Sequence, residues 1–445
     1  MNLDALEEVF RSVLAAVEPA PLTRAAVASL NFSDEPIAVL AVGKAARAML
    51  VGCVEALEHV GATPVAMLAV GATDEGPCPA GAEVLTGDHP LPGARSLAAA
   101  AAIDRWREGI PTDARVLVLL SGGTTSLIAA PVPEIPAADI PPLFDQLHRS
   151  GADIMSMNAV RKRVLRHAAG RLTVALAPRR IDLLIASDVL GDDPAFIGSG
   201  PCTPDSLTAG KVIRMLERVG AAEALPPTVR HYLDDVHHKR IAETPKPGSA
   251  VFRAVTTRIL VSNRTAVEAA AAAASRTGFD PVRVIAQPLK GEARAVGTEL
   301  GSRLVAWRQQ LAAGGTSPQS IACTVAGGET TVTLGAGAHG RGGRCQEMAL
   351  ALARELHRLR PRSETIRVLV AGTDGRDGPT DAAGAVVDAT TWSRIGNAGR
   401  QPDRDLQTHD AYAALDAAGA LLRTGPTGTN VNDVVIACVS PASTA

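Results

Sequence analysis

The 445-residue chain has few aromatic residues, an almost balanced charge and no long apolar run. Aromatic residues make up 2% of the chain and the formal net charge is −2. Nucleic-acid binding needs a basic surface or stacking rings, so we expect no such partner. No stretch reaches the roughly 18 apolar residues that suggest a membrane span, and the acidic N-terminus does not resemble a secretory signal. These absences predict a cytoplasmic protein without a membrane partner.

The six cysteines are scattered, with no C-x-x-C pair, and the ten histidines show no H-E-x-x-H spacing. We therefore expect buried free thiols in a reducing compartment, and neither a disulfide framework nor a zinc site. The sequence also lacks the motif G-x-x-x-x-G-K-[ST] and the signature set of protein kinases. A conventional P-loop is thereby excluded.

What the chain does contain is a recurring pattern, in which a short apolar run precedes small or charged residues and then a helical stretch. The apolar runs are residues 37–42, 116–120, 181–186, 259–261 and 368–371. Continuous apolar runs suit strands that are covered on both faces, so the pattern predicts an α/β fold with a mostly parallel sheet. In such folds ligands bind beyond the carboxyl ends of the strands. We therefore expect one site built from several of the loops that follow these runs.

The length exceeds the size at which one hydrophobic core keeps growing, so two domains are expected. Prolines and charges interrupt the apolar periodicity between residues 222 and 250. We place the domain boundary in this segment. The alanine tracts at 98–102 and 268–274 indicate helix interiors, because alanine is the best helix former.

A dinucleotide-like glycine pattern lies in the stretch 327–347. Gly335, Gly337 and Gly340 match the G-x-G-x-x-G fingerprint, which in nicotinamide-dependent enzymes leaves a strand and opens a helix. The flanking residues instead predict an antiparallel hairpin with strands at 321–326 and 330–334, joined by Gly327, Gly328 and Glu329. The nicotinamide interpretation is therefore disfavoured. A glycine-rich hairpin exit that binds nothing stays an alternative.

Two glycine-rich loops could bind an anion. Arg341 and Arg344 precede a predicted helix at 345–359, and open amides, a helix N-terminus and two guanidinium groups together make an anion site. The second loop, residues 119–126, contains two glycines and several hydroxyls that could surround a phosphate group. An ordinary turn that enters a helix is the alternative for this second loop.

Carboxylates follow two of the apolar runs. They are Asp188, Asp192 and Asp193 after residues 181–186, and Asp374, Asp377 and Asp381 after residues 368–371. Carboxylates at strand ends can bind Mg²⁺ or take a proton from a hydroxyl group. The alternative is an N-cap or a solvated turn, which we expect of Asp192 or Asp193 more than of Asp188.

Two basic residues also follow apolar runs or turns. Lys44 comes after Gly43 at the end of the first run, where a lysine can reach a phosphate or carboxylate group; the alternative is a side chain that lies along the surface. His89, in the stretch 87–93, is expected to fix its loop through a hydrogen bond.

With these stretches assembled, the chain resembles the type-2 glycerate kinases, a family once described as hydroxypyruvate reductases. The stretches that carry the resemblance occur in family order; they are AVGKAA (41–46), GDHPLPG (87–93), LLSGGTTSLIAAP (119–131), MNAVRKRVLRHAAGRL (157–172), SDVLGDDPAFIGSGPCTPD (187–205), SNRTAVEAA (262–270), GGETTVTL (327–334), GRGGRCQEMAL (340–350), AGTDGRDGPTDAAGAVVD (371–388) and TGPTGTNVND (424–433). Two positions depart from the family pattern. Cys345 stands where the family has asparagine, and Thr124 stands where a third glycine is usual.

The resemblance implies phosphorylation of D-glycerate at the 2-hydroxyl group by ATP, with Mg²⁺, to give 2-phosphoglycerate. It implies a Rossmann-like, mostly parallel sheet domain over residues 1–235, followed by a smaller mixed α/β C-terminal domain over residues 250–445. The second domain would contain a MOFRL region at about 318–440, and the site would lie in the cleft between the domains. Small molecules are the only partners expected, and a homodimer is one candidate for the oligomeric state.

Phosphoryl transfer needs positioning and charge compensation more than covalent help from the protein. We therefore predict Lys44 and Arg341 as catalytic cations, and Asp188 and Asp374 as catalytic acids that bind Mg²⁺ or orient the hydroxyl group. The residues predicted to bind substrate or nucleotide are Gly43, Ser121, Gly122, Gly123, Gly327, Gly328, Glu329, Arg344, Asp377, Thr427 and Asn430. Thr429 and Asp433 lie in the same late loop as the last two.

Two other classes of function stay open. An NAD(P)H-dependent hydroxypyruvate reductase would act on the same carbon skeleton, because hydroxypyruvate is oxidised glycerate. A non-catalytic binding protein would hold an acid or a nucleotide without turnover.

Overall fold

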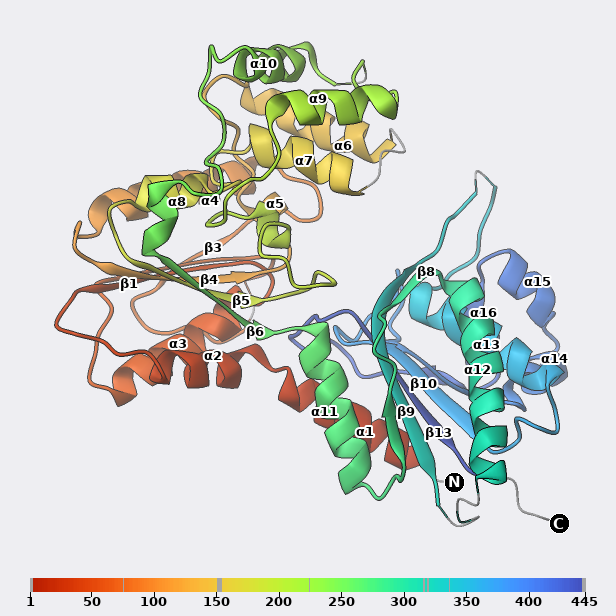
Figure 1. The fold of residues 1–445 in the computed structure, drawn as a ribbon. Helices are drawn as coiled ribbons and strands as arrows, with labels where there is room; N and C mark the ends of the chain where they lie inside the picture. The colour runs from red at the N-terminus through yellow and green to blue at the C-terminus, as the bar shows by residue number, and fades with distance from the viewer. Residues whose placement is uncertain are drawn as a thin grey trace. The chain divides into compact units, whose positions relative to one another are not determined.

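The computed structural model describes residues 3–74, 76–149, 154–223, 225–314, 317, 320–335 and 337–441. The chain forms two compact units (Figure 1). We call Pro19–Leu260 the central unit, and Met1–Glu18 together with Val261–Ala445 the terminal unit. Each unit is described by itself.

A six-stranded sheet with the order β3-β2-β1-β4-β5-β6 forms the middle of the central unit. The strands are β1 (Ile37–Val42), β2 (Ala66–Gly71), β3 (Glu83–Thr86), β4 (Arg115–Ser121), β5 (Ile181–Ala186) and β6 (Val255–Val261). Neighbouring strands from β3 to β5 pair in parallel, and β1, β4 and β5 are buried throughout. This is the strand order of the Rossmann fold, so the predicted fold class is confirmed.

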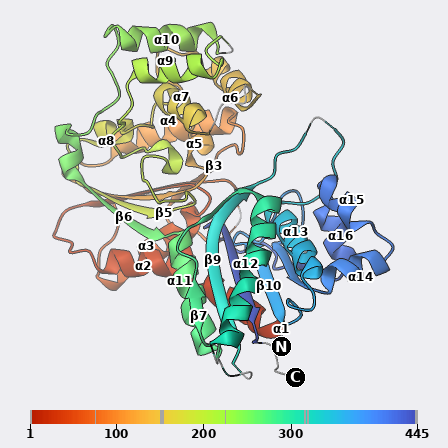
Figure 2. The same ribbon diagram turned by 45° about the vertical axis from the view of Figure 1, so that its right-hand side comes forward.

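Helices cover both faces of this sheet, and a further helical layer lies beyond the helices of one face (Figures 1 and 2). The helices are α2 (Pro19–Ala28), α3 (Ala46–His59), α4 (Ala94–Gly109), α5 (Thr124–Leu127), α6 (Ile140–Arg149), α7 (Ile154–Val164), α8 (Arg171–Leu176), α9 (Ala209–Arg218) and α10 (Pro227–His237), with 3₁₀ turns η1 (Ala137–Asp139), η2 (Ile197–Ser199) and η3 (Ala250–Ala254). The layer of α6, α7, α9 and α10 has an apolar core of its own, which includes Phe144 and Tyr232. The segment 222–250, in which the domain boundary was predicted, contributes α10 to this layer.

A mixed sheet with the order β12-β11-β10-β13-β9-β7 forms the middle of the terminal unit, and β8 also pairs with β9. The strands are β7 (Val282–Val284), β8 (Leu289–Glu292), β9 (Ala322–Thr331), β10 (Ile366–Gly372), β11 (Gly384–Asp388), β12 (Leu421–Leu422) and β13 (Asp433–Val439). Strand β13 lies between β9 and β10 and is antiparallel to both, whereas β7 and β8 pair with β9 in parallel. The mixed α/β class predicted for the C-terminal part is therefore confirmed.

The first helix of the chain belongs to the terminal unit. Helices α1 (Leu3–Ala16) and α11 (Asn263–Arg276) cover one face of the mixed sheet, and α12 (Ala293–Ala313) and α13 (Arg344–Arg358) cover the other, with α14 (Thr391–Asn397), α15 (Pro402–Gln407) and α16 (Ala411–Ala417) beside α13. Helix α1 packs on α11 and β13 with a fully buried stripe that contains Leu6, Val9 and Val13. Burial of this stripe explains why α1 belongs to the terminal unit, although the predicted N-terminal domain of residues 1–235 includes it.

The predicted hairpin at residues 321–334 is wrong, because Ala322–Thr331 forms the single strand β9. Gly328 in this strand pairs with Leu289 of β8 on one side and with Asp433 of β13 on the other. A Cβ atom on Gly328 would lie 2.1 Å from the Leu289 carbonyl oxygen. Glycine is therefore required here for the close approach of a neighbouring backbone and not for a turn.

Gly328→Ala should destabilise the terminal unit by about 2 kcal/mol, because the added methyl group overlaps backbone atoms that cannot move aside. Chemical denaturation followed by circular dichroism measures the change. Gly335→Ala is the matched control, since a Cβ atom on Gly335 meets nothing within 4 Å. Equal stability of the two variants would contradict the close-approach explanation.

The structure tests two further expectations, the state of the cysteines and the presence of a membrane-spanning helix. All six cysteines are free, and five of them are buried, as expected from their spacing. Among the described segments of the chain, no helix has the length and apolar character that a membrane crossing needs.

Candidate active site

The loops that follow β1 and β4 meet at the point where the strand order of the central sheet reverses. The Lys44 N–H donates to the Gly122 carbonyl oxygen at 2.9 Å, and the Ala45 N–H donates to Ser121 Oγ at 3.0 Å. A Cβ atom on Gly43 would lie 2.1 Å from Ser121 Oγ. Parallel strands end at the same edge of a sheet, and ligands of Rossmann-like folds bind at this reversal point. The predicted residues at these two strand ends are thus brought together.

Lys44 and Asp188 lie on either side of the glycine turn after β4. A Cβ atom on Gly122 would be 1.8 Å from Asp188 Oδ2, and one on Gly123 would be 3.2 Å from Lys44 Cγ. Both glycines therefore leave room for side chains from neighbouring strand ends. The Lys44 side chain is exposed and makes no ion pair with any residue in the described part of the chain.

Burial raises the pKa of Asp188, and the positive charge of Lys44 acts against this rise. Burial also lowers the pKa of His89, and Lys44 lowers it further. A neutral imidazole and an ammonium group thus lie beside a half-buried carboxyl group. Such a set can hold an anionic reactant and accept a proton from a hydroxyl group.

His89 does not fix its loop, because it makes no hydrogen bond with any residue that the structure describes. Asp88 does so in its place. Asp88 Oδ2 accepts from the Arg95 N–H at 2.8 Å and from the Ser96 N–H at 3.3 Å at the start of α4. The prediction for His89 was wrong because an aspartate caps a helix N-terminus better than a neighbouring histidine.

The loop after β5 separates its three aspartates as expected. Asp193 Oδ1 accepts from the Ala195 N–H at 2.9 Å, which makes it a turn-forming residue. Asp192 has a positive φ of 54° in the same turn. Only Asp188 of the three packs on the glycine turn.

A second group of predicted residues lies in the terminal unit around Arg344. Arg344 Nε donates to Asp433 Oδ2 at 2.7 Å, Nη2 donates to Asp433 Oδ1 at 3.0 Å, and Nη1 donates to Glu329 Oε1 at 2.9 Å. Asp433 is buried, and burial raises its pKa while Arg344 opposes that rise. The charge of Asp374 raises the pKa of Asp433 as well, so the two carboxylates are close. Strand ends of β9, β10 and β13 thus bring three acids and one arginine together.

The N-terminus of α13 holds a carboxylate of the protein itself. Asp377 Oδ1 accepts from the Cys345 N–H at 3.0 Å, and Oδ2 accepts from the Gln346 N–H at 2.8 Å. Burial raises the pKa of Asp377 to about 7. The Cys345 and Gln346 N–H groups already donate to Asp377, so they are not available to a phosphate group at the predicted anion site. Asp377 positions α13.

Among the described residues, Arg341 contacts Tyr412, Pro379 and Asp410, which are not members of the Arg344 group. Its guanidinium carbon is 4.9 Å from the centroid of the Tyr412 ring, and Nη2 donates to the Pro379 carbonyl oxygen at 3.3 Å. Its backbone N–H donates to Asp410 Oδ1 at 3.0 Å. Asp381 also belongs to this surface, where it accepts from the Tyr412 hydroxyl group at 2.7 Å.

The late glycine-containing loop is tied to β10. Thr427 Oγ1 donates to the Thr373 carbonyl oxygen at 2.5 Å, and Asn430 Oδ1 accepts from the Asn432 N–H at 3.1 Å. Thr429 Oγ1 donates to the carbonyl oxygen of Val17 at 2.9 Å. Thr427 and Asn430 therefore shape the loop that leads into Asp433.

Asn263 was not predicted as a site residue, although the structure gives it a positioning role. Its Nδ2 donates to the carbonyl oxygens of Val431 at 2.7 Å and Asp433 at 3.1 Å. A Cβ atom on Gly327 would lie 2.1 Å from Asn263 Oδ1, so the glycine leaves room for this asparagine. No local pattern could reveal the role, because the partners are far away in the sequence.

Asp188 and Asp374 fit Mg²⁺ only as single carboxylate ligands. Across the residues that the structure describes, no three side chains of His, Cys, Asp or Glu gather in a way that could hold a metal ion. Mg²⁺ in phosphoryl-transfer sites commonly uses one or two carboxylates with substrate phosphates and water. A nucleotide-borne Mg²⁺ is therefore compatible with either aspartate.

Two family models match the chain. A domain of unknown function (DUF4147) covers residues 5–234, and the MOFRL family covers residues 322–433. The chain is 36% identical to the glycerate 2-kinase of Pyrococcus horikoshii, over 80% of this chain and 78% of that protein. It is 35% identical to an Agrobacterium vitis protein with the provisional name hydroxypyruvate reductase, over 96% of this chain and 92% of that protein. A crystal structure of a glycerate kinase from Thermotoga maritima is similar, with a TM-score of 0.83, 32% identity and 98% of each chain covered.

Proposed function

Because the chain belongs to the glycerate kinases with a MOFRL domain, a family of phosphotransferases, we propose that it phosphorylates glycerate. The donor is ATP, the acceptor is the 2-hydroxyl group of D-glycerate, and the product is 2-phosphoglycerate. The observation that carries this proposal is the position of Lys44 and Asp188 around the Gly122–Gly123 turn at the reversal point of a Rossmann sheet. An exposed ammonium group, open glycine backbone and a half-buried carboxyl group suit the transfer of a phosphoryl group.

Each residue of this turn has a role in the proposal. Lys44 stabilises negative charge on the transferring phosphoryl group, and the backbone of Gly122 and Gly123 lets phosphate oxygens approach. Asp188 orients the acceptor hydroxyl group and takes its proton, which its raised pKa favours. Ser121 holds the loop after β1 through the Ala45 N–H and so fixes the start of α3.

We assign further roles in the proposal to residues of the terminal unit. Asp374 is the candidate acid there, and Arg344 positions Asp433 and Glu329 through its ion pairs. Arg341, held on Tyr412, is a cation for the nucleotide. Mg²⁺ bound to the nucleotide phosphates would neutralise part of their charge. We also propose a cytoplasmic protein that forms a homodimer, which fractionation and light scattering test.

The reaction class is tested with purified protein, ATP, Mg²⁺ and D-glycerate. We expect ADP release that depends on glycerate, and a phosphorus NMR spectrum of 2-phosphoglycerate in the product mixture. NADH with hydroxypyruvate is the parallel assay for the reductase alternative. NADH oxidation without ADP release would overturn the proposal in favour of a reductase. Binding without turnover in either assay would indicate a binding protein.

The roles of Asp188 and Asp374 can be separated by their Asp→Asn variants. Loss of a metal ligand should raise the Mg²⁺ concentration for half-maximal rate about tenfold or more. Loss of the acid that orients the hydroxyl group should lower kcat without changing the Mg²⁺ dependence. We expect the second result for Asp188→Asn, because burial raises the pKa of Asp188 and so favours its role as proton acceptor. Steady-state rates across a Mg²⁺ titration decide between them. If both variants keep the wild-type kcat and the wild-type Mg²⁺ concentration for half-maximal rate, both roles are contradicted.

A further inference from the structure

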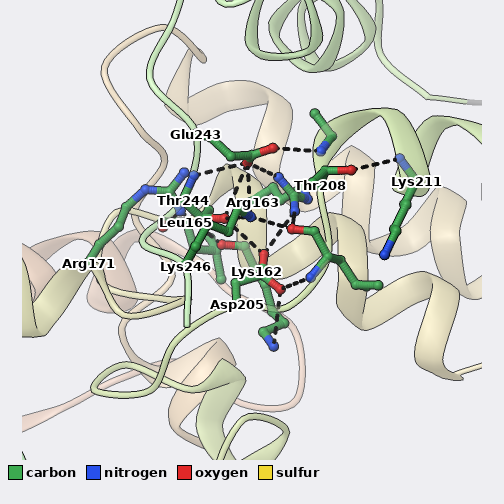
Figure 3. A network of polar contacts seen from close by, with 12 residues as sticks. Lys162, Arg163, Leu165, Arg171, Asp205, Thr208, Lys211, Glu243, Thr244 and Lys246 are labelled. Carbon is green, nitrogen blue, oxygen red and sulfur yellow. Dashed lines mark hydrogen bonds and ion pairs between the residues drawn. The ribbon is translucent and has the colours of Figure 1, made fainter. Parts of the chain in front are cut away.

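A network of charged side chains joins α7 to the segments 205–211 and 243–246 in the central unit (Figure 3). Its ionisable members are Lys162, Arg163, Arg171, Asp205, Glu243 and Lys246. Four are cations and two are acids, so the network has more positive than negative charge. Buried charges are normally paired or bound to a ligand.

The two acids of this network are already satisfied within the protein. Asp205 Oδ2 accepts from Arg163 Nη2 at 2.9 Å and from Thr244 Oγ1 at 3.0 Å. Glu243 Oε2 accepts from the Ala209 N–H at 2.8 Å, and Oε1 also bonds to Arg163. Arg163 thus contacts both carboxylates, and Lys246 Nζ lies 3.5 Å from Glu243 Oε1.

Lys162 is the cation that this arrangement leaves without a close partner. Its side chain is 6% exposed, and its Nζ lies 4.0 Å from Asp205 Oδ1, beyond hydrogen-bond distance. It donates no hydrogen bond to any residue of the described chain. The centroid of the Phe196 ring is 5.3 Å away, and the carboxylate of Asp193 also acts on the charge of Lys162, although no hydrogen bond joins the two residues. An ammonium group has three donors, so a buried one requires acceptors.

A small part of the Lys162 side chain reaches the surface of the protein. Its exposed fraction is 6%, compared with 1% for Arg163 and 3% for Asp205. A ligand oxygen can occupy such a position without opening the structure.

The position of Lys162 links it to the glycine turn of the candidate site. Helix α7 packs on η2, which directly follows Phe196. In η2, Ser199 Oγ lies 2.8 Å from Thr125 Oγ1, and Thr125 belongs to the helix that follows the Ser121–Gly123 turn. The loop from Asp188 to Ser199 therefore connects both places within the central unit.

We propose that Lys162 binds an anionic oxygen group of a substrate, either the carboxylate of glycerate or a phosphate of the nucleotide. The inference rests on the proposed kinase function and assigns to α7 a role in substrate specificity. Arg163, Asp205 and Glu243 hold α7 so that the Lys162 ammonium group stays in place. The shared chemistry is a charge-assisted hydrogen bond from the ammonium group to an anionic oxygen.

Lys162→Met tests the proposal, with Lys246→Met as the matched control. Lys246 is a lysine of the same network, so its replacement changes the network charge by the same amount. Unlike Lys162, it already has an acceptor within the protein, because its Nζ donates to Thr244 Oγ1 at 2.7 Å. We expect Lys162→Met to raise one KM about 10- to 100-fold, as loss of one charged hydrogen bond does. A raised KM for glycerate identifies the carboxylate, and a raised KM for ATP identifies the phosphate. Unchanged values for both substrates overturn the proposal.

Calorimetric titration with D-glycerate and with inorganic phosphate gives a readout that does not need turnover. Wild-type protein should bind at least one of these probes about tenfold or more tightly than Lys162→Met does. If wild-type protein lacks glycerate-dependent ADP release, the proposed function fails while this titration still decides the role of Lys162. If Lys162→Met does not fold, Lys162→Gln replaces it in both measurements. Equal affinity of wild type and a folded variant for both probes counts against the inference.

Discussion

Lys44→Ala should lower kcat for ATP-dependent phosphorylation of glycerate by about 10²-fold or more. Loss of a positive charge that stabilises a transition state has an effect of this order. Lys44 is exposed and makes no ion pair with any residue in the described ranges, so the variant should keep the stability of the wild type. Steady-state ADP release and a thermal unfolding curve together separate lost catalysis from lost folding.

Lys211→Ala is the control for this experiment. Lys211 is an exposed lysine of α9 in the same unit, so its removal changes the net charge equally. We expect nearly wild-type turnover from it. Near-normal kcat in Lys44→Ala would show that the reacting groups lie elsewhere than at the turn after β4.

Arg344→Ala should destabilise the terminal unit by about 3 kcal/mol. The substitution leaves Asp433 buried without the arginine that meets both of its carboxylate oxygens, and an unpaired buried charge is costly. Removing one partner of a buried ion pair typically costs about 3–5 kcal/mol. We expect the low end of this range because one-third of the Arg344 side chain is exposed. Urea denaturation at pH 8 measures the loss. Adding Asp433→Asn should recover part of it, since a neutral amide costs less to bury.

The pH dependence of this loss distinguishes a charge effect from lost packing. Burial already raises the pKa of Asp433 in the folded state, and Arg344→Ala removes the charge that opposes the rise. A raised folded-state pKa means that stability is lost as the pH rises through it. The deficit of Arg344→Ala relative to wild type should therefore shrink as the pH falls and Asp433 is protonated.

A surface ion pair provides the control for Arg344. Arg303 lies 3.6 Å from Glu299, and both side chains are largely exposed. Arg303→Ala should change the free energy of unfolding by less than about 0.5 kcal/mol. A deficit for Arg344→Ala that is equally small, or that does not vary with pH, would contradict the buried pair as its cause.

The candidate residues of the central unit were predictable because their positions follow from local patterns. Each apolar run marks a strand, and parallel strands covered on both faces end at one edge. Lys44, Ser121 and Asp188 all come directly after such runs, so the sequence places them near one another. The loop positions of Asp192 and Asp193 followed from the same pattern.

The terminal unit was predicted less well, because its glycines and charges act through partners that are far away in the sequence. Gly327 and Gly328 look like a turn, yet each leaves room for another segment, one for Asn263 and one for Leu289. Arg344 looks like a phosphate ligand, yet its guanidinium group pairs with Asp433 and Glu329. Neither the spacing nor the composition of the loop distinguishes these alternatives.

The sequence by itself determined the α/β class, four strands of the Rossmann sheet (β1, β4, β5 and β6) and the positions of Lys44, Ser121 and Asp188 at strand ends. Apolar runs and the residues that follow them are local properties, so no tertiary information was required. Only the tertiary structure decided which charges are neutralised and which are open. In the structure Arg344 pairs with Asp433, and the first amides of α13 donate to Asp377. The side chains of Lys44 and Lys162 have no acceptor within hydrogen-bond distance among the described residues. The reason is that the partner of a charge is fixed by packing between distant segments, which a local pattern does not encode.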